Sequence, residues 1–201
     1  MCDPFFYEDL AHKAGYGLIA GVDEAGRGPL AGPVVAAAVI LPQGIELAGV
    51  RDSKRMTAKA REEAFVIINR QALGSGIGVV SNGYVDKFNV LRASLEAMRR
   101  AVLALDPQPE FLLVDGINSV PLLMIPQRCL KKGDQTSKSI SAASVVAKVY
   151  RDRIMDSYHE RYPAYGFDKH KGYGTRRHLE ALKKFGPCPV HRLTFRGVLQ
   201  G

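Results

Sequence analysis

The chain has 201 residues, of which 46% are hydrophobic and 24% are charged, values that are ordinary for a globular protein of one domain. No apolar run approaches the ~20 residues that a helix needs to span a bilayer, and the N-terminus lacks the pattern of a secretory signal, so we expect a cytoplasmic protein without a membrane anchor. The formal net charge of +8 favours an anionic partner such as nucleic acid. The three cysteines of the chain form no C-x-x-C pair, which argues against a zinc site.

The first strong pattern is an apolar run over residues 18–22, followed by two adjacent carboxylates and a glycine-rich turn. The run predicts a buried strand, with Asp23 and Glu24 at its end. Because neighbouring side chains on a strand point to opposite faces, both carboxylates can serve one site only if the backbone bends there. The Gly-Arg-Gly of residues 26–28 supplies that freedom and a cation. The alternative is an ordinary hairpin with polar residues at the end of a strand.

Apolar strands and amphipathic helices alternate through the middle of the chain. Thr57 is a candidate N-cap for a helix with an apolar stripe as far as residue 73. A second helix is expected over residues 90–105, where apolar side chains recur three and four apart. The remaining strands are expected over residues 34–41, 76–81, 111–115 and 122–125.

Two further carboxylates follow turns or strand ends. Asp115 ends a wholly apolar run and precedes Gly116, and Asp134 follows a basic loop. Carboxylates at the ends of strands are how many α/β folds present metal ligands, although a single one is as often a turn former. The pattern therefore offers four candidate ligands without deciding between these alternatives.

Two segments later in the chain carry candidate contacts to a nucleic acid. In a helix predicted over residues 140–152, Ser144 and Lys148 are four residues apart and share one face. They could hold a phosphate, or they could be a surface pair without a function. Tyr173 is the one aromatic residue in the basic loop of residues 169–178, a setting typical of stacking on a nucleotide. A helix with Thr175 as its N-cap should follow this loop.

Four segments, in the same order, resemble type 2 ribonuclease H, whose bacterial form is ribonuclease HII. They are Asp-Glu-Ala-Gly-Arg-Gly-Pro-Leu-Ala-Gly-Pro-Val from residue 23, Asp-Ser-Lys at 52–54, Gly-Asp at 133–134 with the Ile-Ser-Ala-Ala-Ser helix, and Lys-Gly-Tyr-Gly-Thr at 171–175. Arg55-Met56 stands where the family usually has Lys-Leu. The resemblance implies an α/β ribonuclease H-like fold, with a mixed five-stranded sheet flanked by helices. One domain over residues 1–201 is expected, with a small helical C-terminal part from about residue 160.

The resemblance also implies a role for each candidate. Two divalent ions, Mg²⁺ or Mn²⁺, would be held by Asp23, Glu24, Asp115 and Asp134. The ribose 2′-hydroxyl would be read by the backbone of Gly26, Arg27 and Gly28, since glycines let amides approach a sugar. Phosphates would meet Lys54, Ser144 and Lys148, and Tyr173 would pack on the sugar next to the cut.

The activity implied is an endonuclease that hydrolyses the RNA strand of RNA–DNA hybrids and cuts 5′ of single ribonucleotides in duplex DNA. Two ions about 4 Å apart would serve the attacking and leaving oxygens. The partners expected are therefore these two kinds of duplex, and the protein is expected to be a monomer. Two other readings are another carboxylate-dependent nuclease and a basic nucleic-acid-binding protein without catalysis, which would bind regardless of divalent metal.

Overall fold

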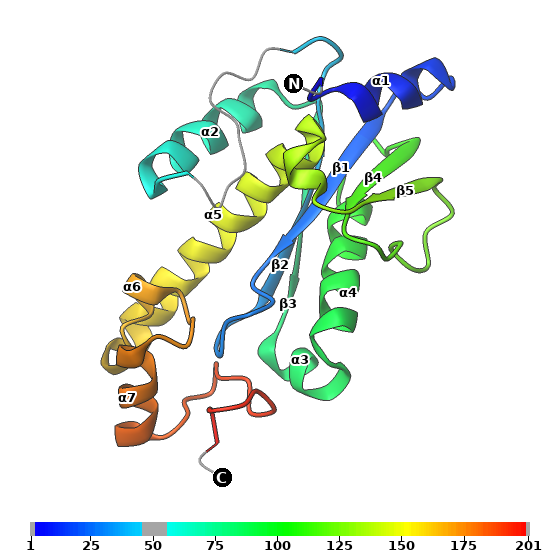
Figure 1. Cartoon of the computed structure of the whole chain (residues 1–201). Coiled ribbons are helices and arrows are strands. Elements are labelled where there is room, and N and C mark those ends of the chain that lie inside the picture. The colour runs from blue at the N-terminus through cyan, green and yellow to red at the C-terminus, as the bar shows by residue number, and fades with distance from the viewer. Residues whose placement is uncertain (1–2, 46–55, 200–201) are drawn as a thin grey trace.

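A computed structural model describes residues 3–45 and 56–199 and shows a five-stranded sheet with helices on both faces (Figure 1). The strands are β1 (Ile19–Ala25), β2 (Val34–Ile40), β3 (Gly74–Val80), β4 (Phe111–Asp115) and β5 (Gln127–Leu130), in the spatial order β3-β2-β1-β4-β5. The first three strands are antiparallel, and β4 runs parallel to both β1 and β5. The expected mixed α/β sheet is confirmed.

The helices cover the two faces of this sheet. They are α1 (Phe6–Lys13), α2 (Ala58–Gln71), α3 (Asn82–Phe88), α4 (Val90–Leu103), α5 (Lys138–Arg161), α6 (Phe167–His170) and α7 (Arg176–Phe185), with short 3₁₀ turns η2 (Gly133–Gln135) and η3 (Pro163–Tyr165). One buried cluster joins α4 to one face, and a second joins α2 and α5 to the other. Thr57 caps α2 as expected, since its hydroxyl accepts from the Ala60 N–H at 3.2 Å. In the part of the chain that the structure describes, no helix is long and apolar enough to cross a membrane.

Glycines allow two helices to lie unusually close to the sheet. A Cβ on Gly21 of β1 would stand 2.1 Å from the carbonyl carbon of Ser139 in α5. Cβ atoms on Gly76 and Gly78 of β3 would stand 2.1 and 2.0 Å from carbonyl oxygens of α4. Any side chain at these positions would force the layers apart. The close approach of α5 brings its residues up to the end of β1, where the site lies.

The expected fifth strand over residues 122–125 is wrong, because β5 begins at Gln127. Leu122 has a φ of +58° and is 89% exposed, and Met124 is fully exposed, so this apolar stretch is a surface turn. The Gln127 side chain closes the turn by exchanging two hydrogen bonds of 2.8 Å with the Val120 backbone. Apolar composition alone suggested a strand, whereas the left-handed φ and the exposure exclude one.

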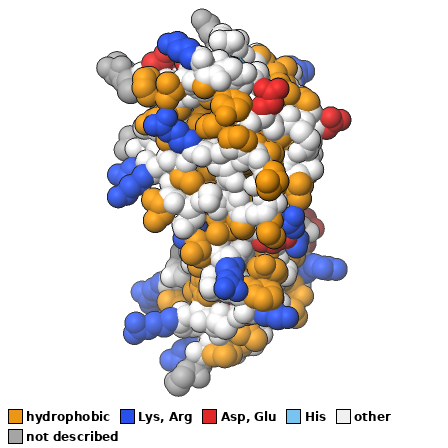
Figure 2. Space-filling view, turned by 90° about the vertical axis from the view of Figure 1, so that its right-hand side faces the viewer, with side chains coloured by type: hydrophobic (Ala, Val, Ile, Leu, Met, Phe, Trp, Pro, Cys, Tyr) orange, Lys and Arg blue, Asp and Glu red, His pale blue; other side chains and the backbone are white. Residues whose placement is uncertain are grey.

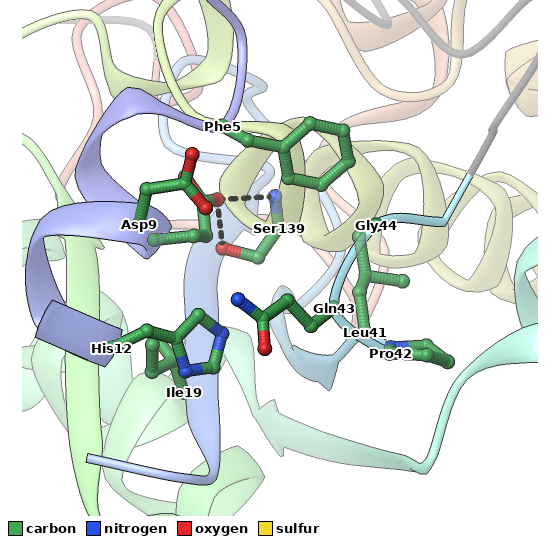
Figure 3. Close-up of a pocket in the computed structure, with 10 residues that line it drawn as sticks. Phe5, Asp9, His12, Ile19, Leu41, Pro42, Gln43, Gly44 and Ser139 are labelled. Carbon is green, nitrogen blue, oxygen red and sulfur yellow. Dashed lines mark hydrogen bonds between the residues drawn. The ribbon is translucent and has the colours of Figure 1, made fainter. Parts of the chain in front are cut away.

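Helix α1 was not expected from the sequence, and it docks on the start of α5. Ser139 donates to the buried carboxylate of Glu8 from its backbone N–H at 2.9 Å and from its hydroxyl at 2.7 Å (Figure 3). Ser137 adds a third bond of 2.7 Å to the same Glu8 oxygen, Oε1. Because a helix N-terminus attracts negative charge, Glu8 stabilises the first turn of α5.

The C-terminal part lies at the far end of α5, around its own buried cluster (Figure 1). Phe167 and Met155 are fully buried in this cluster. Thr175 caps α7 as expected, with its hydroxyl accepting from the His178 N–H at 3.4 Å, and the helix ends at Gly186. These elements carry Tyr173 toward the turn that follows β1.

Candidate active site

Asp23 and Glu24 lie within the last residues of β1, where they pair with Ala37 and Ala36 of β2. Their side chains leave opposite faces of the strand. Asp23 faces α5 and accepts a hydrogen bond from the hydroxyl of Ser144. Glu24 instead lines a cavity of about 290 Å³ against α4. The site therefore lies where the two faces of the sheet meet at the end of β1.

Asp115 comes to the same place at the end of β4. The parallel register pairs Val22 with Val114, so Asp115 stands next to Asp23 across the ladder. Asp115 lines the same cavity as Glu24, and its Oδ1 accepts from the Gly133 N–H at 2.7 Å. Asp134, the next residue, is 5% exposed. Two strand ends thus bring Asp23, Glu24 and Asp115 together, and the 3₁₀ turn places Asp134 directly after the residue that donates to Asp115.

The carboxylates raise one another's proton affinity. Burial raises the pKa of Asp23 well above its ordinary value, and the charges of Glu24 and Asp115 raise it further. The Ser144 hydroxyl and the Glu24 N–H, at 2.7 Å, act in the opposite direction. Burial also raises the pKa of Glu24, partly offset by Arg27, which forms an ion pair with it at 3.2 Å. Without a compensating positive charge, these shifts favour the protonated carboxyl at both residues.

This donor set suits divalent cations of the hard type, which prefer carboxylate oxygens. In residues 3–45 and 56–199, no three Asp, Glu, His or Cys side chains converge closely enough, as they stand, to hold an ion together. The four carboxylates fit such ions in kind and in burial, whereas their side chains do not converge on one point in this arrangement.

The glycine-rich turn lies beside this centre. Gly26 has a φ of +102°, and a Cβ there would stand 2.2 Å from Nε of Arg151. Gly28 has room, because a Cβ there would meet only Cε1 of Tyr173, at 3.6 Å. The Tyr173 ring is 46% exposed and so remains accessible. The turn and the aromatic residue, 145 residues apart in sequence, face each other.

The three candidates for phosphate contact differ in their surroundings. Ser144 is 4% exposed and directed at Asp23 rather than at the surface. Lys148 is partly buried and donates to Asp152 at 2.5 Å, and burial lowers the pKa of its ammonium group. Lys54 lies outside the described residues. Ser144 and Lys148 therefore do not form one exposed pair.

Two buried arginines support the turn, and sequence reasoning did not identify either. Arg151, 1% exposed, donates to the carbonyls of Pro33, Ala31 and Lys171 at 3.0–3.1 Å. Arg192 is fully buried. Because arginine is rarely buried, no local pattern marks these two residues as internal. The resemblance of the segments that contain them was the one available signal.

The comparisons with known proteins agree with this geometry. A family model described as Ribonuclease HII matches residues 20–198. The chain is 55% identical to ribonuclease HII of Geobacter metallireducens over 192 residues, 96% of this chain and 90% of the relative. It is 58% identical to ribonuclease HII of Citrifermentans bemidjiense, over 95% of this chain and 83% of the relative.

Solved structures give the same result. The crystal structure of ribonuclease H2 from Pyrococcus horikoshii superposes with a TM-score of 0.78 at 28% identity, covering 90% of this chain and 95% of the other. Sequence, sheet topology and the position of the carboxylates thus point to one group of enzymes, and the chain belongs to the ribonuclease HII family of ribonucleases H.

Proposed function

We propose that this ribonuclease H uses Asp23, Glu24, Asp115 and Asp134 as the ligand set of its reaction centre. The observation that carries the proposal is the burial of like-charged carboxylates at the adjoining ends of β1 and β4, with a raised pKa at both Asp23 and Glu24. Such an arrangement opposes folding unless it serves a ligand, and raised carboxylate pKa values cluster at functional sites. Two divalent ions would satisfy it.

Enzymes of this family depend on divalent metal ions. When bound, such ions activate the attacking water and stabilise the leaving oxygen of a phosphodiester. The chain's own residues orient the ligands. Ser144 directs Asp23, the Gly133 N–H fixes one oxygen of Asp115, and Arg27 restrains Glu24. Mg²⁺ and Mn²⁺ both suit carboxylate oxygens, and we propose that either supports the reaction.

The substrate we propose is the RNA strand of an RNA–DNA hybrid and a single ribonucleotide in duplex DNA, cut on its 5′ side. Backbone amides of residues 26–28 would read the 2′-hydroxyl, the group that separates RNA from DNA. Tyr173, beside Gly28, would pack on the sugar that lacks this hydroxyl. The exposed Tyr173 ring and the open space over Gly28 support this assignment.

The phosphates would be bound by basic groups around the cleft. Lys148 would exchange its ion pair with Asp152 for a backbone phosphate, and Lys54 would contact a second phosphate. Lys and Arg side chains also lie along one edge and around the lower end of the face in Figure 2. We further propose that residues 1–201 act as one catalytic domain and as a monomer.

The test is cleavage of duplex DNA that contains one ribonucleotide, with Mg²⁺, with Mn²⁺ and with a chelator, and with the cut mapped on a sequencing gel. We expect a single cut 5′ of the ribonucleotide that leaves 3′-hydroxyl and 5′-phosphate ends, and no cut in all-DNA duplex. Equal cutting of both duplexes would contradict the proposal that residues 26–28 read the 2′-hydroxyl. Cleavage in the presence of the chelator would contradict the proposed dependence on a divalent metal.

A further inference from the structure

Residues 188–194, which we term the strap, join the C-terminal part to the glycine-rich turn. The Arg192 N–H donates to the Leu30 carbonyl at 2.8 Å, and the Gly32 N–H donates to the Val190 carbonyl at 2.8 Å. These bonds form a short antiparallel bridge. The strap is therefore attached to the turn through its backbone, independently of any side chain.

Arg192 adds a second attachment through its guanidinium group. It donates to four backbone carbonyls of the turn: Gly26 at 2.6 Å, Arg27 at 3.0 Å, Pro29 at 2.9 Å and Gly32 at 3.0 Å. The flat guanidinium fork can reach all four, whereas a lysine ammonium has only three donors on a compact centre. Arg192 thereby determines the path of the backbone that contains the proposed 2′-hydroxyl reader.

The neighbouring residue, His191, is connected through His178 to Tyr173, the aromatic residue that faces the turn. Nδ1 of His178 bonds the Tyr173 carbonyl at 2.9 Å, and because a carbonyl can only accept, this nitrogen carries the proton. Nε2 of His178 must then accept from Nε2 of His191 at 2.9 Å. Nδ1 of His191 is left to accept from the Cys188 N–H at 2.9 Å. The chain of bonds has one direction and ends on Tyr173.

Helix α3 anchors the outer side of the strap. The Asn82 amide donates to the carbonyls of Pro189 and His191 at 3.0 and 2.9 Å. The Asp86 carboxylate accepts from the N–H groups of Leu193 and Thr194, both at 3.0 Å. The strap is therefore held to the sheet layer as well as to the turn.

We propose that His191 and Arg192 are positioning residues that set the distance between the backbone of residues 26–28 and the ring of Tyr173, and so determine selectivity for a ribonucleotide followed by DNA. The inference rests on the proposed function. Two adjacent residues of one strap fix the two elements, which share no sequence neighbourhood. Burial lowers the pKa of His191 to about 4, so the histidine chain is neutral and keeps one tautomer at neutral pH.

The experiment compares catalytic efficiency on duplex DNA with one ribonucleotide and on a continuous hybrid. His191→Leu breaks the chain to Tyr173, whereas His191→Gln keeps a donor near the position of Nε2. Arg192→Lys removes part of the carbonyl clamp. We expect His191→Leu and Arg192→Lys to lower the ratio of the two efficiencies about tenfold, within the range that small misplacements cost. His191→Gln should keep most of the ratio.

Matched controls are His159→Asn and Arg153→Lys, whose side chains lie outside the strap and contact Asp168 at 3.4 Å and Glu62 at 2.7 Å, respectively. Both should leave the ratio at the wild-type value. If Arg192→Lys fails to fold, the pair of His191 variants decides the test. An unchanged ratio in His191→Leu, or an equal loss on both substrates, would overturn the proposal. If wild type itself shows no dependence on a ribonucleotide, the proposed function fails instead.

Discussion

Two regions of the molecule bury ionisable side chains of one sign, the carboxylate centre at the end of β1 and the strap at the C-terminal end. Asp23 is 3% exposed and has Glu24 and Asp115 as charged neighbours. Arg192 is fully buried, with Arg151 lowering its pKa in addition to the effect of burial. Both regions therefore carry the cost of desolvating like charges.

The regions differ in how that cost is offset. In the strap, carbonyl oxygens surround Arg192, and His191 and His178 stay neutral because burial lowers their pKa values. In the carboxylate centre, the pKa of Asp23 rises instead, since its hydrogen bonds do not balance the effects of burial and of the charges of Glu24 and Asp115. An internally satisfied charge holds the structure, whereas an unbalanced charge is available to a ligand.

The largest expected effect is that of Asp23→Asn on catalysis. We expect turnover to fall about a hundredfold or more, as for the loss of a principal stabiliser of the transition state. Without divalent ions the variant should be at least as stable as wild type, because a carboxyl with a raised pKa costs stability while it is charged. Turnover and thermal unfolding, each with Mg²⁺ and with a chelator, provide the measurement. More than a tenth of wild-type turnover, or a lower unfolding temperature in the chelator, would contradict it.

The strap should show the opposite pH dependence from Asp23. A histidine whose pKa falls from 6.5 unfolded to about 4 folded binds fewer protons when folded, so stability is lost as pH falls between these values. The loss should reach about 3 kcal/mol, the size of that shift in free energy. Urea unfolding between pH 4 and pH 7 measures it. His191→Gln should flatten the curve, and an unaltered slope would exclude His191 as its source.

Alanine variants of two glycines in the same turn distinguish a residue needed for stability from a residue that contacts the substrate. Gly26→Ala should destabilise the protein by about 1–3 kcal/mol, because its Cβ would overlap Arg151 at a φ of +102°. Gly28→Ala should cost less than about 0.5 kcal/mol, since its Cβ has room, and should weaken cleavage by crowding the reader beside Tyr173. Unfolding and cleavage measured on both variants test this. Equal unfolding temperatures for the two would contradict it.

The smallest effect is expected for Lys148→Ala. If Lys148 exchanges Asp152 for a phosphate, duplex binding should weaken alike for all sequences, and its salt dependence should fall by about one unit of slope. Binding titrations at several salt concentrations give this slope. Lys59→Ala, an exposed lysine of α2, serves as the matched control. An unchanged slope for Lys148→Ala would mean that the lysine only pairs with Asp152.

The sequence by itself determined four of the five strands, two helix caps and the positions of Asp23 and Asp115 near the ends of strands. The run that became β2 is wholly apolar and fully buried, and Thr57 and Thr175 cap helices through bonds to residues three positions away. These features follow from local chemistry, which a pattern of a few residues records. The same holds for Asp115, which ends an apolar run and therefore ends a strand.

Only the tertiary structure decided which charged residues are internal and which apolar ones are not. Arg192 is buried because it meets the carbonyl of Gly32, 160 residues away, and no local pattern could record that contact. The stretch around Met124 looked like a strand but is exposed, because the Gln127 side chain closes it as a turn and β5 follows. Pairing across such separations depends on where the whole chain brings its donors and acceptors, since most buried polar groups of a folded protein are hydrogen-bonded.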